Sequence, residues 1–264
     1  MFDYHLHSTF SDDARSPMPD VIEAAIAQGL EGIALTDHLD PFYQDDEYPW
    51  ELDLPRYWDA LTAAEEQFGG RIRFAKGIEL GMTQGEGVQA CEDAVTAYPF
   101  DFVIASVHHT KRAPIHTARF LEGRPMAAVI EEYYTEVLAC IRAFKSYDVL
   151  GHLNVIDRYT EGYAAESVYM PYAEEILKQA IADGKGIEVN TSTFRYGMAD
   201  RGTPTPAILR RYKELGGEIV TTGSDAHDAR SVGAFIKEGE EILLAHGFRY
   251  VATFRGHVPT LHKL

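Results

Sequence analysis

The sequence predicts an α/β protein whose strands close into a distorted barrel of seven β/α units. Short apolar segments of strand character alternate with helical segments about seven times over 264 residues, with no break in composition. Such alternation is typical of a parallel sheet, and this number of units favours a TIM-like barrel, with an open doubly wound sheet as the alternative. Histidine and carboxylate residues also recur directly after the strand segments. We therefore expect one barrel domain over residues 1–264.

Apolar periodicity and helix breakers define the elements of the first half. Pro19 suits the first turn of a helix whose apolar residues have helical spacing, and Gly29 marks its end. The apolar residues of segment 126–144 repeat at three and four, which predicts a long amphipathic helix. The other elements of this half are predicted as strands at 2–7, 32–36, 72–80 and 102–107 and as helices at 56–68 and 88–97.

The second half continues the same alternation with shorter strands. Segment 39–55 has no regular pattern and is long enough to form a lid or rim over a site, with a surface excursion as the alternative. A second long excursion is predicted at 110–124. The predicted elements are strands at 148–150, 186–190, 218–222 and 248–254 and helices at 172–183, 206–215 and 231–245.

The composition is that of a globular protein with an acidic surface. Hydrophobic residues make up 45% of the chain and charged residues 25%, which provides apolar material for a large core. The formal charge, 24 − 41 = −17, repels nucleic acid phosphates, so we expect no nucleic acid partner. No apolar stretch is as long as a membrane span, which needs about 18 residues, and the N-terminus has no signal-peptide pattern. Cys91 and Cys140 form no CxxC pair, so we expect free thiols and a cytoplasmic location.

Two histidines at the end of the first predicted strand introduce the candidate site. Side chains of a strand alternate between its faces, so His5 and His7 point the same way and can hold one metal ion. The HxH pattern alone is weak evidence, since a buried strand can carry two histidines by chance. The pair gains weight because similar residues follow the other strands, at Asp37, His38, Glu79, His108, His152, Asp225 and His227.

These recurring residues predict a metal centre with more than one ion. The carboxyl ends of parallel barrel strands converge on one face, where active sites form. Imidazole and carboxylate ligands suit zinc, manganese or iron, and a carboxylate such as Glu79 would bridge two ions about 3.5–4 Å apart. His108 and His109 point to opposite faces, and the register of the preceding strand favours His108. The remaining histidines are interpreted as surface residues: His116, His246, His257 and His262.

Two assignments near the first strands have alternatives. Either Asp12 or Asp13 could bind a metal ion from the first loop, while the other would be solvated. Asp37 is either a ligand or an acceptor that orients His38, and we favour the second role.

Seven segments together resemble the polymerase and histidinol phosphatase (PHP) family of metallo-phosphoesterases, in its histidinol-phosphatase branch. They are HLHS at 5–8, TDH at 36–38, GIEL at 77–80, SVHH at 106–109, GHLNVIDRY at 151–159, IEVNTS at 187–192 and GSDAH at 223–227. The resemblance extends over nearly the whole chain and is much more specific than HxH alone. It implies a distorted barrel of the PHP type and a single PHP metallo-phosphoesterase domain.

The resemblance also implies three divalent metal ions, which could be zinc, manganese or iron. By position, the first ion would be held by His5, His7, Glu79 and Asp225, the second by Glu79, His108 and His152, and the third by Asp13, His38 and His227. The segment GHLN departs from the branch, because Asn154 stands where the branch often has Asp.

The implied activity is hydrolysis of a small phosphate monoester, L-histidinol phosphate in histidine biosynthesis, by attack of metal-bound hydroxide. Asp13 or His227 would protonate the leaving alkoxide, and Arg158 and Arg195 would bind the phosphate. The acidic run 45–47 would meet the cationic groups of histidinol or form a solvated charge run.

Three other functions are compatible with parts of the pattern. A phosphoesterase of this type could act on another small phosphate ester such as a nucleotide, and a substrate panel would separate the two. A metal-dependent amidohydrolase also begins with HxH, but it uses a lysine late on a strand, and Lys76 faces away from Glu79 by alternation. A non-catalytic metal-binding module is disfavoured by the complete ligand set. The sequence leaves the metal identity and the oligomeric state open.

Overall fold

The main sheet is a nearly closed parallel barrel. The computed structural model describes residues 1–43 and 50–264 of the chain. Seven strands follow one another in the order β1-β2-β4-β5-β6-β7-β8, and β3 pairs with β4 beside this path. The strands are β1 (Phe2–Leu6), β2 (Gly32–Leu35), β3 (His38–Leu39), β4 (Arg73–Gly81), β5 (Phe102–Ser106), β6 (Val149–Leu150), β7 (Gly186–Asn190), β8 (Val220–Gly223), β9 (Tyr250–Arg255) and β10 (Val258–Lys263). The predicted distorted barrel of seven strands is confirmed.

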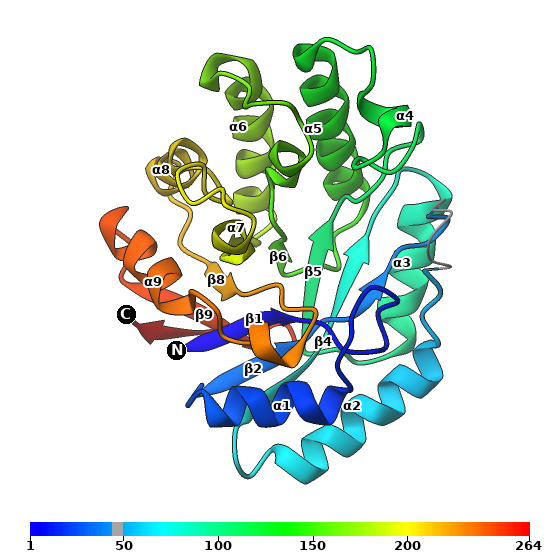
Figure 1. The fold of residues 1–264 in the computed structure, drawn as a ribbon, viewed down its shortest axis with the longest axis vertical. Coiled ribbons are helices and arrows are strands. Elements are labelled where there is room, and N and C mark those ends of the chain that lie inside the picture. The colour runs from blue at the N-terminus through cyan, green and yellow to red at the C-terminus, as the bar shows by residue number, and fades with distance from the viewer. Residues whose placement is uncertain (44–49) are drawn as a thin grey trace.

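Backbone hydrogen bonds between the end of β1 and the segment after β8 close the barrel. The amide of Asp225 donates to the carbonyl of His5 at 2.8 Å, and the amide of His7 donates to the carbonyl of Ala226 at 2.9 Å. Figure 1 shows the two ends of the sheet side by side, with blue β1 next to orange β8. Closure therefore brings residues that are more than two hundred positions apart in the sequence to one rim.

Helices pack around the outside of the barrel (Figure 1). Asp53 caps α2 by accepting from the amide of Arg56 at 3.1 Å, and Thr205 caps α8 by accepting from the amide of Ile208 at 3.2 Å. None of the helices in the described part of the chain is long and apolar enough to cross a membrane. The helices are α1 (Met18–Ala27), α2 (Leu54–Phe68), α3 (Glu86–Ala97), α4 (Ala118–Leu121), α5 (Met126–Ala143), α6 (Glu166–Ala182), α7 (Ser192–Arg195), α8 (Pro206–Glu214) and α9 (Ile236–Ala245), with short 3₁₀ turns η1 (Val155–Arg158) and η2 (Ala229–Ser231).

Two predicted helix starts in the second half were wrong, and the last predicted strand lies outside the barrel. Helix α6 begins at Glu166 instead of 172, because Pro171 lies inside the helix and the buried face that starts at Tyr169 continues across it. Helix α9 begins at Ile236 instead of 231, because the preceding Phe235 has a left-handed backbone with φ of 61°. The last predicted strand is β9, which pairs with the unpredicted β10 as an antiparallel hairpin and is not part of the barrel path.

The amino end of the barrel is filled by apolar side chains. Phe102 packs edge-on against Tyr4 and tilted against Phe254 of β9, with ring centroids 5.1 Å apart in both pairs. These residues belong to one buried cluster with Phe2 and Ile104. The hairpin thus closes this end of the barrel, which leaves the carboxyl ends of the strands for a polar site.

An irregularity in β1 separates the two ends of the barrel. Asp3 pairs with Ile33 and Leu6 pairs with Leu35, so β1 spans this interval with one more residue than β2. An extra residue of this kind interrupts the strict alternation of side chains. Tyr4 reaches the apolar end and the next residue, His5, reaches the polar end of the same interior.

The turn of the β9–β10 hairpin is anchored to the barrel by His257. Its Nδ1 lies 3.0 Å from the Asp148 carboxylate, and its backbone amide donates to the carbonyl of Asp101 at 3.0 Å. The hydrogen bond to Asp148 raises the pKa of this half-exposed imidazole above its ordinary value. Protonated His257 therefore stabilises the folded protein. This contribution is complete at pH values below the pKa of His257 in the unfolded chain, and it is lost as the pH rises through the higher pKa of the folded protein.

We predict that His257→Ala lowers the free energy of unfolding by roughly 0.5–1 kcal/mol near pH 6, the scale of a half-exposed charged hydrogen bond. The difference from wild type should shrink towards pH of about 9, where the unsubstituted imidazole is neutral. Urea unfolding of both proteins at the two pH values measures this. A difference that does not depend on pH would contradict a charged contact with Asp148.

Candidate metal centre

Glu79 lies at the centre of a buried polar cluster at the carboxyl ends of the strands. Its Oε2 atom is 2.9 Å from Nε2 of His5 and 3.5 Å from Nε2 of His7. Oδ1 of Asp225 is 3.8 Å and 3.5 Å from the same two nitrogens. Two imidazoles from β1 and its end therefore converge with carboxylates from β4 and from the segment after β8.

The other oxygen of Glu79 faces a second group of imidazoles. Oε1 is 2.8 Å from Nε2 of His152, which follows β6, and 3.4 Å from Nε2 of His108, which follows β5. These two nitrogens are 3.4 Å apart. The hydroxyl of Ser106 donates to Oε1 at 2.6 Å. Glu79 thus has one oxygen in each of two ligand groups, the geometry of a bridging carboxylate.

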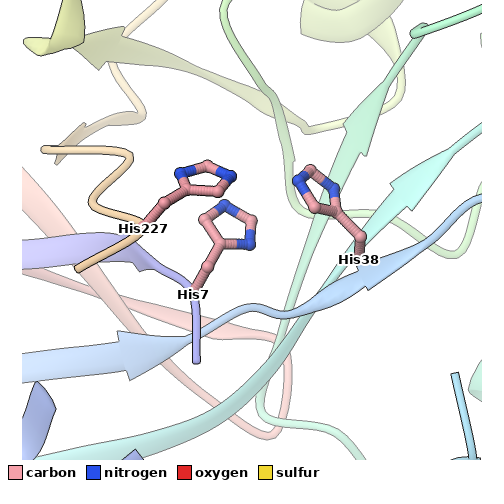
Figure 2. A group of neighbouring side chains, drawn as sticks. All are labelled: His7, His38 and His227. Carbon is pink, nitrogen blue, oxygen red and sulfur yellow. The ribbon is translucent and has the colours of Figure 1, made fainter. Parts of the chain in front are cut away.

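A third group lies on the solvent side of the first. Figure 2 shows the rings of His7, His38 and His227 turned towards one another, and they offer nitrogens within 4.8 Å of one another. Oδ2 of Asp13 is 3.1 Å from Nε2 of His227. Nδ1 of His38 is also 3.1 Å from Oε2 of Glu79. His7 lies between the first and third groups.

The donor set fits divalent cations. In the third group, three ligand-type atoms are buried without a hydrogen-bond partner: His7 Nε2, Asp13 Oδ1 and His38 Nδ1. Buried polar atoms are normally paired, so this group of unpaired ligand atoms fits a bound cation. Imidazole nitrogens and carboxylate oxygens in such numbers are ligands of zinc, manganese or iron.

The protonation of the cluster follows from burial opposed by neighbouring charges. Burial raises the pKa of Glu79, but the surrounding imidazoles, His5 first, outweigh it and hold this pKa well below its usual range. Burial lowers the pKa of His227, but the Asp13 hydrogen bond and the Asp225 charge overcome it and raise this pKa to about 9. The carboxylates of the cluster are therefore ionised at neutral pH and can act as ligands.

The carboxylate of Asp37, which follows β2, holds the loop after β1 in place through Ser8 and Ser11. The carboxylate of Asp37 accepts from the amide and hydroxyl of Ser8 at 2.6 and 2.9 Å and from the hydroxyl of Ser11 at 2.7 Å. The oxygen of Ser11 in turn accepts from the backbone amide of His38 at 3.0 Å and lies 3.2 Å from Nδ1 of His7. Asp37 therefore positions both histidines through Ser11 and does not touch the imidazole of His38 directly.

The structure distinguishes the residue pairs that the sequence left open. Asp13 reaches His227, whereas Asp12 is exposed. His108 reaches Glu79, whereas His109 packs edge-on against Tyr43 at a centroid distance of 5.0 Å.

Two further residues named from the sequence lie outside the cluster. Asn154 donates to Asp157 at 2.9 Å and to the carbonyl of Gly202 at 3.1 Å, away from the ligand groups. Lys76 points outward to Glu65 at 3.0 Å, as alternation predicts, so no lysine of β4 enters the site.

Two buried carboxylates next to the cluster were missed by the sequence analysis. Oδ2 of Asp40 is 2.7 Å from Nδ1 of His108, and Gly81 leaves the space that this carboxylate occupies. Oε1 of Glu188 is 2.6 Å from Nδ1 of His5. Each has a weak signal in the sequence: Asp40 follows His38 at strand spacing, and Glu188 interrupts an otherwise apolar strand.

The ligand groups open into a cavity of about 540 Å³. Arg158 enters it from η1, with Nη2 donating to the hydroxyl of Ser192 at 2.9 Å and its guanidinium 4.1 Å from the ring centre of Tyr196. Arg195 lines the same cavity and donates to the carbonyls of Ser224 and Asp225 at 2.7 and 2.8 Å. The outer wall is formed by Tyr43, Trp50, Ile115, His116, Val155 and Tyr159.

Segments 39–55 and 110–124 both contribute to this wall, and a rim role was expected only for 39–55. His116 is exposed but lines the cavity, so its interpretation as a plain surface residue was incomplete. The acidic residues Asp45, Asp46 and Glu47 lie outside the described residues.

Asp225 reaches its position through an unusual backbone. It has a left-handed φ of 54°, which is costly for a residue other than glycine. The closing hydrogen bond from its amide to His5 and the two donors of Arg195 hold this conformation. Backbone strain of this kind concentrates at functional sites.

Comparisons with known proteins agree with this geometry. A family model described as "PHP domain" matches residues 3–192. The histidinol-phosphatase of Lactococcus lactis subsp. lactis (strain IL1403) is 30% identical, over 96% of this chain and 94% of the relative. A probable histidinol-phosphatase of Clostridium acetobutylicum is also 30% identical, over 90% of each chain.

A solved structure is similar over the whole fold. The crystal structure of histidinol phosphate phosphatase from Lactococcus lactis, complexed with zinc, L-histidinol and phosphate, superposes with a TM-score of 0.88 at 28% identity and covers 98% of both chains. Together with the family model, which spans well over half of the sequence, these similarities confirm the resemblance found in the sequence motifs. The chain belongs to the PHP family.

Proposed function

We propose that this chain is a metal-dependent phosphomonoesterase that hydrolyses L-histidinol phosphate to L-histidinol and phosphate, with a role in histidine biosynthesis in the cytoplasm. The observation that carries the proposal is the cluster around Glu79, which opens into a cavity of about 540 Å³ with two arginines in its wall. The relatives named histidinol-phosphatase cover nearly the whole chain, and one was crystallised with zinc, L-histidinol and phosphate.

The proposed centre has three divalent ions held by nine residues. The first ion would take His5, His7, Glu79 and Asp225, the second Glu79, His108 and His152, and the third Asp13, His38 and His227. The distances of 2.8–3.8 Å among the atoms of the first two groups support this division. Zinc is the ion to test first, and manganese and iron suit the same ligands. Ions bound there would lower the pKa of a water molecule and neutralise phosphoryl oxygens.

The side chains around the centre would bind the phosphate, supply a proton and contact the alcohol part of the substrate. Arg158 and Arg195 line the cavity and would bind the phosphoryl oxygens. Asp13 or His227, 3.1 Å apart, would deliver a proton to the leaving alkoxide from an atom that does not bind the third ion. The aromatic wall would contact the alcohol part of the substrate and exclude water.

We also propose that residues 1–264 form one PHP domain. The family model ends at residue 192, but β8 and the residues after it complete the barrel and supply Asp225 and His227. A chain cut after residue 192 would lack both.

Zinc-loaded wild-type protein should release phosphate from L-histidinol phosphate, and dialysis against a chelator should abolish this. Glu79→Gln should lower kcat roughly 10³-fold or more, because the side chain shared by two ligand groups loses its negative charge. Lys76→Met is the control, since Lys76 lies on the same strand but faces helix α2. A phosphate-release assay with malachite green measures all three. The absence of phosphate release by wild type from this substrate would end the proposal.

Arg158→Met should lower kcat/KM for L-histidinol phosphate about 100-fold, with most of the effect in KM, because a bidentate phosphate contact is lost. Its bound zinc should not change. Arg201→Met is a matched control: Arg201 also packs on tyrosines, at 4.9 Å from Tyr163 and Tyr169, but it pairs with Asp157 outside the cavity. It should affect stability and leave KM unchanged. Equal KM values for wild type and Arg158→Met would argue against phosphate binding by Arg158.

A further inference from the structure

Glu188, on β7, is buried beneath the ligand cluster and contacts three segments of the barrel. Its Oε1 is 2.6 Å from Nδ1 of His5. Its Oε2 accepts from the backbone amide of His152 at 2.9 Å and from the side-chain amide of Asn190 at 3.1 Å. Gly223 of β8 leaves this space free, because a Cβ atom there would overlap both the carboxylate and His5.

The partners of Glu188 determine the direction of each hydrogen bond. The backbone amide of His152 and the side-chain NH₂ of Asn190 can only donate, so Oε2 has to accept. The other nitrogen of His5, Nε2, lies 2.9 Å from Oε2 of Glu79 and faces the proposed first ion. A neutral imidazole binds a metal through the nitrogen that has no proton. His5 therefore has to carry its proton on Nδ1 and donate it to Oε1 of Glu188.

We propose that Glu188 is a positioning residue that selects the metal-binding tautomer of His5 and holds His152 in the adjacent ligand group. A carboxylate accepts at both ends, which this place in the barrel requires. Glutamine has the same shape but donates at one end. With its NH₂ towards His152, donors would face donors. With its NH₂ towards His5, Nδ1 would accept and the proton would move to Nε2, where it blocks the metal.

The test compares zinc binding by wild type and Glu188→Gln. Zinc affinity is measured by competition with a chromogenic chelator and stoichiometry by elemental analysis, so neither readout depends on turnover. We expect Glu188→Gln to bind zinc about 10–100-fold more weakly, the usual effect of losing an orienting partner of a ligand histidine. In the zinc-loaded wild type, the ¹⁵N chemical shifts should show the His5 proton on Nδ1 and no proton on Nε2.

Glu136→Gln is a matched control. Glu136 is also buried and accepts from one backbone amide and one side-chain amide, both of Gln84, at 2.8 and 2.7 Å. Glu136→Gln also replaces a carboxylate acceptor by a donor, but on helix α5 instead of beneath the ligand cluster. We expect this variant to lose thermal stability and to keep wild-type zinc affinity.

Glu188→Asp keeps the negative charge and both acceptors on a shorter side chain. It should bind zinc more tightly than Glu188→Gln, and it serves as the test if the glutamine variant does not fold. Equal zinc affinity of wild type and Glu188→Gln, or weaker binding by Glu188→Asp than by Glu188→Gln, would overturn this proposal alone. The proposal rests on the proposed function in one respect, that the cluster binds metal. A wild-type protein that binds none of zinc, manganese and iron would overturn both.

Discussion

The site depends on the closure of a parallel barrel around one carboxylate. Glu79 is fully buried at the carboxyl ends of the strands, and each of its oxygens faces a different group of imidazoles. A buried carboxylate is expensive unless it is paired, and here the pairing partners come from strands on both sides of the barrel. If the sheet stayed open between β1 and β8, His5 and Asp225 would separate and Glu79 would lose half of its environment.

Several local features of the backbone make this arrangement possible. The extra residue in β1 lets Tyr4 fill the apolar end while His5 enters the polar end. The left-handed backbone of Asp225 turns its carboxylate inward immediately after the closing strand. Gly81 and Gly223 leave room for the carboxylates of Asp40 and Glu188, which a larger residue would displace. The first two features depart from regular strand geometry, and the two glycines lie beside carboxylates that contact His108 and His5.

The two ends of the barrel have different roles. At the amino end, aromatic side chains and the β9–β10 hairpin form a dense apolar closure that depends on packing. At the carboxyl end, the same strands end in buried imidazoles and carboxylates whose ligand atoms lie close together. The apolar packing at one end therefore supports the polar cluster at the other end. This division is the usual one in β/α barrels.

The sequence alone was sufficient for the barrel, the family and the residues at the strand ends. Strand and helix periodicity are local properties, and motifs such as HLHS and GSDAH identify their residues without reference to a partner. Boundaries were less accurate where tertiary packing outweighs local preference, as at Pro171 inside α6.

Only the tertiary structure decided which atoms meet. Asp40, Ser11 and Glu188 acquire their roles from contacts across the barrel, and no pattern of neighbours along the chain specifies such a contact. The choice of Asp13 over Asp12 depends on how one loop folds against His227. Short-range order along a chain follows from backbone geometry and side-chain alternation, whereas the distance between two side chains from different strands follows from register and closure. For this protein, the sequence therefore predicted which residue types lie at the strand ends, and only the closed barrel determined which of them are in contact.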